Sequence, residues 1–289
     1  MRTILYKIML VILVGISVNA NAQSDSAIHT FSFRIGTYYN SHLNYYGRTD
    51  SLRSSGFFPI AELWLNNKFY LNAAPIFTNN SLSGFQYAGT VATAGYLTNN
   101  GKSSTHIYLV KPVYKDNSEL VQSSLKAQVA VSFTKLNKVI NFTAGADVKF
   151  SGNTDYGANI GLDHIFRKQF PGNFVLVIDP SVYAYAGTQQ FTQTSYEKNG
   201  FLIFPGTEKE VTEDVKKFTL LSYEASVPVI AAKGKWMLLA TPSFVIPQNI
   251  VTIENRPDLS ERGKAMFYMT AGAKLSFIVM FTGRGKLTL

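Results

Sequence analysis

The chain has 289 residues, a formal net charge of +9 and no cysteine. The absence of thiols excludes disulfides, thiolate metal sites and a lipid anchor attached to a cysteine. The basic residues are scattered along the chain rather than gathered in one helix or run, so the charge does not indicate a nucleic-acid partner.

Residues 1–22 have the features of a cleaved secretory signal. Arg2 and Lys7 give a positive start, residues 8–18 form a short apolar core, and Ala20-Asn21-Ala22 is a small-x-small cleavage site. The alternative is a membrane anchor, but a spanning helix needs about 20 apolar residues and this core is shorter. We therefore expect export and a mature chain, 23–289, that forms a single domain.

Beyond the signal, no apolar run is long enough for a helical span, and the dominant pattern has a period of two. In 125–133 the apolar residues take the odd positions, and in 141–150 they take the even ones. Successive side chains of a strand point to opposite faces, so each segment has one apolar and one polar face. Such strands cross a membrane when they close into a barrel with its apolar face outward.

Twelve segments carry strand signals of this kind. Many are close to the roughly 9–11 residues that a tilted membrane strand requires. In chain order we expect strands at 31–39, 57–65, 68–77, 87–96, 106–114, 124–133, 139–150, 156–167, 174–187, 218–229, 236–246 and 265–281. The sequence thus predicts an all-β fold, an antiparallel up-and-down transmembrane β-barrel of about 12 strands, with 10–14 as the range.

Short and long connections mostly alternate between these segments. Tight turns are expected at 66–67, 135–138, 168–172 and 232–235, and longer links at 46–56, 78–86, 188–217 and 247–264. In outer-membrane barrels the short turns face the periplasm and the long loops face outside. The longest link, 188–217, is open to two interpretations: an extracellular hairpin, or a lid folded into the lumen.

The alternation also predicts which charged side chains face the interior of the barrel. This set holds both signs in near balance: Arg34, Glu62, Lys68, Lys126, Asp147, Lys149, Asp163, Arg167, Asp179, Glu224 and Lys274. It fits either a lumen filled by paired charges or a polar channel whose walls select a solute. Asp163, Asp179 and Glu224 are expected on one wall near mid-depth, as a cation or proton site or as partners of basic residues.

No catalytic motif accompanies these residues, so we expect no enzyme activity, no metal site and no cofactor. His42 and His106 lack a Ser or acid partner at motif spacing, and His164 is followed by Ile165 and Phe166 rather than by a serine two residues on. No phosphate loop, metal-binding helix or nucleophile elbow is present.

As a whole, the chain resembles bacterial outer-membrane β-barrel proteins. The resemblance rests on the signal that ends at Ala20-Asn21-Ala22-Gln23, on the alternating strands in 124–150 and on the closing strand 267–275. It departs from that class at the end of the chain, where an aromatic residue usually closes the last strand. Here the chain continues past Phe277 and Phe281 to Leu289. Either the last strand extends to Leu289, or a short periplasmic tail follows it.

The resemblance implies a Gram-negative outer-membrane location, with outer-membrane lipid as the surrounding partner. We expect a passive channel or transporter for small solutes. The alternatives are an accessory barrel with a filled lumen that acts through its loops or an envelope protein partner, and a membrane-embedded hydrolase.

Overall fold

A computed structural model describes residues 29–50, 52–82, 84–115, 120, 125–152, 154–188, 218–250, 261–281 and 287–288. The predicted signal, 1–22, and nearly all of the link 188–217 lie outside these residues. In the described part, no helix is long and apolar enough to cross a membrane.

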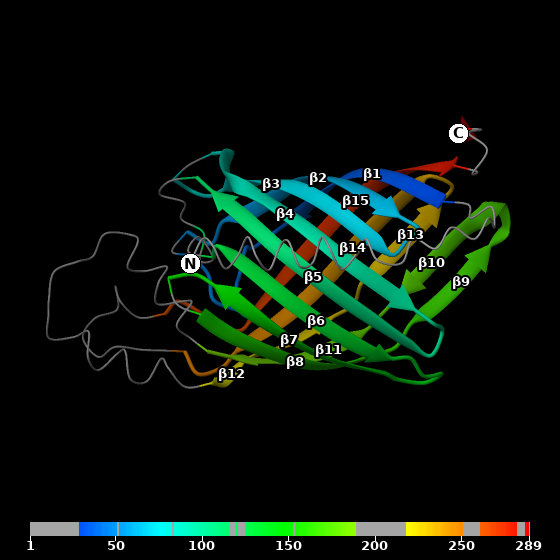
Figure 1. Ribbon diagram of the computed structural model, residues 1–289. Helices are drawn as coiled ribbons and strands as arrows, with labels where there is room; N and C mark the ends of the chain where they lie inside the picture. The colour runs from blue at the N-terminus through cyan, green and yellow to red at the C-terminus, as the bar shows by residue number, and fades with distance from the viewer. Residues whose placement is uncertain are drawn as a thin grey trace, which may run out of the picture.

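Twelve antiparallel strands form a closed barrel, as the alternating pattern predicts (Figure 1). The wall consists of β1 (His29–Asn40), β2 (Ser55–Leu65), β3 (Phe69–Asn79), β4 (Gln86–Asn99), β5 (Ser103–Tyr114), β6 (Ala127–Lys135), β7 (Asn141–Phe150), β8 (Thr154–Asp163), β11 (Ser181–Gly187), β12 (Thr219–Ser226), β14 (Trp236–Pro247) and β15 (Met266–Phe281). Each strand pairs with its neighbours in this order, and β15 pairs with both β14 and β1. That double pairing removes the free sheet edges.

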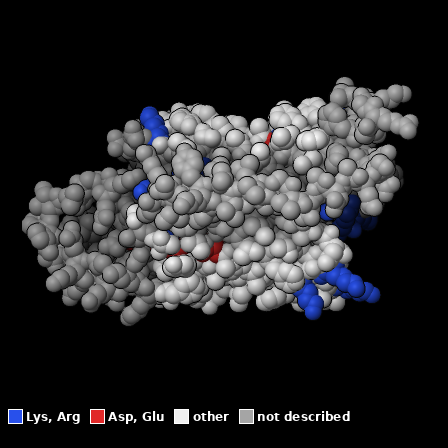
Figure 2. Space-filling model, in the orientation of Figure 1, with Lys and Arg blue, Asp and Glu red and all other residues white. Residues whose placement is uncertain are grey.

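The two faces of the wall differ as the sequence predicts. On β6, Val129, Val131 and Phe133 are 44–46% exposed, whereas Ala130 between them is buried. Apolar side chains exposed in this way on every part of the wall form a band that hydrocarbon can solvate. On the face shown in Figure 2, the visible Lys and Arg side chains lie toward the ends of the barrel.

Three expected strands are each broken in two. The expected strand 156–167 is divided into β8 and β9 (Phe166–Phe170). The expected strand 174–187 is divided into β10 (Phe174–Ile178) and β11. The expected strand 218–229 is divided into β12 and the start of β13 (Val229–Lys233). Pro180 and Pro228 lie at two of the breaks, and their carbonyls accept hydrogen bonds from His164 and Asp179 at 3.1 and 2.9 Å. Proline has no N–H for the ladder and weakens pairing at these positions, although Pro59 and Pro112 lie within paired strands of the wall.

The fragments β9, β10 and β13 extend the wall beyond the end of β8. A single 3₁₀ turn, η1 (Pro171–Asn173), joins β9 to β10. At the end of the chain, β16 (Leu287–Thr288) pairs back onto the last residues of β15. The last wall strand therefore ends at Phe281, before the described residues 287–288 that pair back onto it.

The connections sort to the two ends of the barrel. The turns after β2, β4 and β6 lie at one end, which we call the short-turn end. The connections after β1, β3 and β5 lie at the other, the long-loop end (Figure 1). Asn66 and Asn67 form the turn after β2 with positive φ values, 52° each, a conformation that Asn tolerates better than most residues.

Candidate functional site in the barrel lumen

Paired charges line the lumen where β15, β1 and β2 meet. The Lys274 ammonium lies 2.7 Å from Glu62 Oε1, and Trp64 Nε1 donates to Glu62 Oε2 at 3.0 Å. The Arg34 guanidinium lies 4.5 Å from the centre of the Trp64 ring and donates to Asn67 Oδ1 at 3.3 Å. These contacts bring together Arg34, Glu62 and Lys274, three residues of the predicted inward set.

A second charge cluster lies on β7 and β8. Lys149 is buried and forms an ion pair with Asp147 on the same strand, and Asp155 pairs directly opposite it in the sheet register. The ammonium also lies 5.8 Å from the centre of the Tyr46 ring. One cation thus stands between two carboxylates, which leaves the cluster acidic.

Asp163, Asp179 and Glu224 occupy one wall, as expected, but in different surroundings. Asn141 Nδ2 donates to Asp163 Oδ2 at 2.6 Å, and Asp179 lies within electrostatic range of Asp163. Asp179 Oδ1 is buried and accepts no hydrogen bond from any residue in the described part of the chain. Glu224 instead accepts a hydrogen bond of 2.9 Å from Tyr268 Oη. The first two acids therefore form a pair at the strand breaks, and the third belongs to a separate contact.

Three residues of the predicted inward set lie beyond the ends of the twelve wall strands. Lys68 lies in the turn before β3, Lys126 lies just before β6, and Arg167 is on β9, outside the closed wall; all three are exposed. The prediction failed because it continued the alternation past the ends of the wall strands. Without these three bases, the inward set changes from near balance to an excess of acids.

Inward tyrosines lie flat against the wall because glycines on the neighbouring strand leave room for them. A Cβ at Gly95 would come within 2.3 Å of the Tyr70 ring. A Cβ at Gly161 would come within 2.2 Å of Tyr183, and one at Gly272 within 2.3 Å of Tyr38. The rings therefore cover backbone rather than project across the barrel, an arrangement that also stabilises glycine within a strand.

The same arrangement forms a ladder of rings toward the short-turn end. Trp64 stacks on Tyr70 with ring centres 4.7 Å apart, and a hydrogen bond of 2.8 Å joins Tyr70 Oη to His106 Nε2. The His106 ring lies 4.7 Å from that of Tyr108. No short sequence motif reveals this partner of His106, because Tyr70 lies on another strand, more than thirty residues earlier in the chain.

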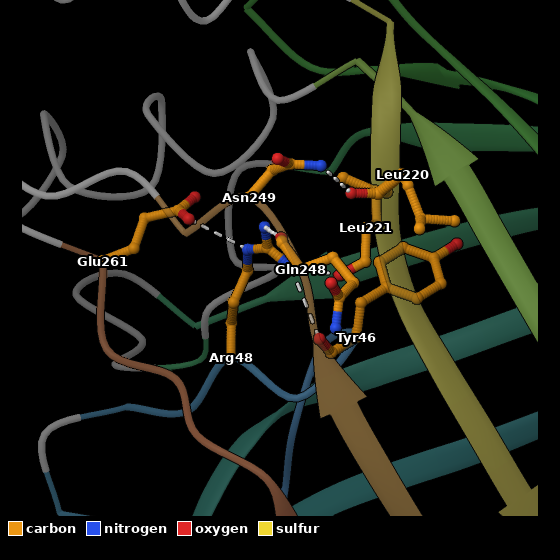
Figure 3. Close-up of polar contacts among 7 residues, drawn as sticks. All are labelled: Tyr46, Arg48, Leu220, Leu221, Gln248, Asn249 and Glu261. Carbon is orange, nitrogen blue, oxygen red and sulfur yellow. Dashed lines mark hydrogen bonds and ion pairs between the residues drawn. The ribbon is translucent and has the colours of Figure 1, made fainter.

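The loop after β1, residues 41–54, folds into the long-loop end of the lumen and is held by Arg48. Its side chain is nearly fully buried, at 1% exposure, and its Nε lies 3.1 Å from Glu261 Oε2. The guanidinium also donates to the carbonyls of Tyr46, Leu221 and Gln248 at 3.0–3.3 Å (Figure 3). One buried arginine thus joins this loop to β12 and to the connection between β14 and β15.

Arg48 places the ring of Tyr46 inside the barrel. The ring centre lies 4.4 Å from that of Tyr45 and 5.1 Å from that of Tyr185 on β11. Burial raises the pKa of the Tyr46 phenol above its ordinary value, and the nearby Asp147 carboxylate raises it further. The ring therefore remains a neutral group at the point where the loop meets the wall.

Among the described residues, no group of three or more His, Asp or Glu side chains is arranged to hold a metal ion. The interior consists of ion pairs, hydrogen-bonded acids and tyrosines. Such groups can bind water and small polar molecules and can favour one sign of ion.

A closed antiparallel wall with an apolar outer band and a charged inner face defines a β-barrel of the outer-membrane type. Comparison with family models found no match, and comparison with curated proteins found none either. The chain resembles solved outer-membrane proteins. It is 11% identical to the KdgM porin, with 86% of this chain and 99% of that one covered and a TM-score of 0.42.

Two further similarities are of the same kind. An outer membrane channel from Pseudomonas putida F1 is 12% identical, with 90% and 98% covered and a TM-score of 0.45. LpxR from Salmonella typhimurium is 11% identical, with 84% and 99% covered and a TM-score of 0.44. Values this low carry no inference about activity or substrate.

Proposed function

We propose that the protein is a passive channel for small solutes in a bacterial outer membrane. The observation that carries the proposal is the packing of the inward tyrosines. Tyr38, Tyr70 and Tyr183 lie over glycines of the adjacent strands, so large rings line the wall without crossing it. Polar and charged groups on the same face give a solute the contacts that a channel wall requires.

The arrangement of the connections supports an orientation. In outer-membrane barrels the short turns face the periplasm. By that rule the short-turn end faces the periplasm, and loop 41–54, which carries Tyr45 and Tyr46, lies toward the outside. The predicted signal at 1–22 supports export of the chain to the cell envelope.

A second candidate is an accessory barrel with a closed lumen. The contacts by which Arg48 holds loop 41–54 in the lumen favour this candidate. A loop held by one ion pair and three backbone carbonyls could close the mouth permanently rather than narrow it. In that case the surface of the loops would carry the function.

Conductance in a planar bilayer separates the two candidates. The purified mature barrel should give discrete current steps, and Tyr46→Ala should enlarge them because it removes a ring that the loop places in the mouth, next to Tyr185. Tyr39→Ala is the matched control, since Tyr39 is 47% exposed on the outer face of β1. Absence of steps in both the wild type and Tyr46→Ala would contradict the channel and favour the accessory barrel.

A further inference from the structure

An apolar cavity lies inside the barrel at the long-loop end, although the rest of the inner face is polar. Its volume is about 230 Å³, and it lies between loop 41–54 and the inner face of β2 to β5. Six of the side chains that surround it are Leu43, Tyr45, Phe58, Ala74, Ile76 and Tyr114.

The sheet register places this cavity on the lumen side of the wall. Phe58 pairs opposite Tyr38, which faces inward, and Ala74 pairs opposite Val91 on β4. Ile76 is 6% exposed, whereas Leu71 on the opposite face of the same strand is 58% exposed. Lipid hydrocarbon therefore cannot fill the cavity through the wall.

The polar side chains at the cavity are used by the loop itself. Asn44 Oδ1 accepts a hydrogen bond of 3.1 Å from the Gly47 N–H, and Asn44 Nδ2 donates to the carbonyl of His42 at 3.4 Å. Asp50 Oδ1 accepts a hydrogen bond of 3.0 Å from the Ser54 N–H. These side chains order the loop backbone, and the wall of the cavity is left to apolar atoms. Apolar cavities of this kind hold water poorly and accept apolar molecules instead.

We propose that the cavity binds a small uncharged aromatic molecule of one or two rings. Its volume lies just below the usual range for ligand pockets, about 300–1,000 Å³, and a molecule of this size fits within it. The rings of Tyr45, Phe58 and Tyr114 offer edges and faces to an aromatic guest. The inference deepens the proposed function, because it names an aromatic solute class for the channel mouth. Binding can nevertheless be measured without transport.

Neighbouring alanines on β3 provide a matched pair for the test. Ala74 lines the cavity, and Ala73 is exposed on the outer face. Fluorobenzene is titrated into the purified full-length mature barrel in lipid nanodiscs and followed by ¹⁹F NMR. We expect a bound resonance in the wild type and in Ala73→Phe, and its loss in Ala74→Phe. Equal signals in all three, or none in the wild type, would overturn the proposal.

Two further variants keep the test decisive if Ala74→Phe does not fold. Ile76→Trp fills part of the cavity and should exclude 2-fluoronaphthalene, which the wild type should bind. A shallow apolar groove of about 470 Å³ on the outer face, next to Ala184, is the competing place for the probe. A fluorobenzene signal lost in Ala184→Phe, together with 2-fluoronaphthalene still bound in Ile76→Trp, would overturn the proposal. Conductance is recorded separately, so aromatic binding without current steps would contradict only the channel.

Discussion

Lys274 on β15 and Glu62 on β2 are joined by an ion pair of 2.7 Å across the intervening strand β1. Gly36 on β1 pairs directly opposite Lys274, and a Cβ there would lie 3.3 Å from that of Lys274. The glycine thus keeps the path between the two charged side chains clear. The pair connects the first strands of the barrel to the last, so it contributes at the place where the wall closes.

Glu62→Gln should destabilise the barrel more than removing both charges does. The single change leaves the Lys274 ammonium without its partner at a site where the two side chains are 7% and 13% exposed. Breaking a buried ion pair costs about 3–5 kcal/mol, whereas replacing both members with neutral residues costs less. Urea unfolding from lipid vesicles should rank the wild type first, Glu62→Gln/Lys274→Met second and Glu62→Gln last. With Lys274→Met measured as the second single variant, additive losses in the double-mutant cycle would mean that the pair contributes no coupling.

Arg48→Met should release loop 41–54 from the lumen. The change removes the ion pair with Glu261 and the bonds to the carbonyls of Leu221 and Gln248. We expect chymotrypsin to cleave after Tyr45 and Tyr46 faster than in the wild type, because cleavage requires the loop to open. Arg53→Met serves as the control, since Arg53 lies in the same loop and is exposed. Equal cleavage rates in all three proteins would show that Arg48 does not hold the loop.

Opposite faces of β6 should respond differently to a charge. Val131→Lys places an ammonium on the outer face, where Val131 is 44% exposed, and a lysine near the midplane of the lipid face costs about 2–4 kcal/mol. Ser132→Lys places the same charge on the inner face and should cost less. Both are measured by urea unfolding from vesicles. Equal losses at the two positions would contradict the assignment of the outer face to lipid.

The alternating pattern predicted the wall well because side-chain direction in a strand depends only on position. It placed Arg34, Glu62 and Lys274 on one face of the wall, and the ion pair and the pairing register bring them together there. It could not predict the role of Arg48, because loops have no period and, apart from Tyr46, its partners lie 173–213 residues away along the chain. It also placed Arg167 inside the lumen, since alternation alone does not show where a wall strand ends.

Prolines mark two of the strand breaks but were not a sufficient sequence signal, because Pro59 and Pro112 lie within unbroken wall strands. Pro180 and Pro228 lie inside segments that were predicted as continuous strands, and the structure breaks the pairing at both. Tyrosines such as Tyr70 and Tyr183 were equally visible in the sequence. Their position flat on a neighbouring strand depends on the register that brings Gly95 and Gly161 beside them, and one strand alone does not determine that register.

Asp179→Asn should reduce the preference of the channel for cations. Asp179 and Asp163 form an acidic pair on the inner wall, and neutralising one carboxylate weakens the field that attracts cations there. The reversal potential across a KCl gradient should shift toward that of an unselective pore, and the shift should shrink in 1 M salt because screening shortens the reach of the charge. Lys68→Gln, in the exposed turn before β3, is the control and should leave the reversal potential unchanged. A change of equal size with Lys68→Gln, or none with Asp179→Asn, would show that the Asp163 and Asp179 pair does not face the conducting path.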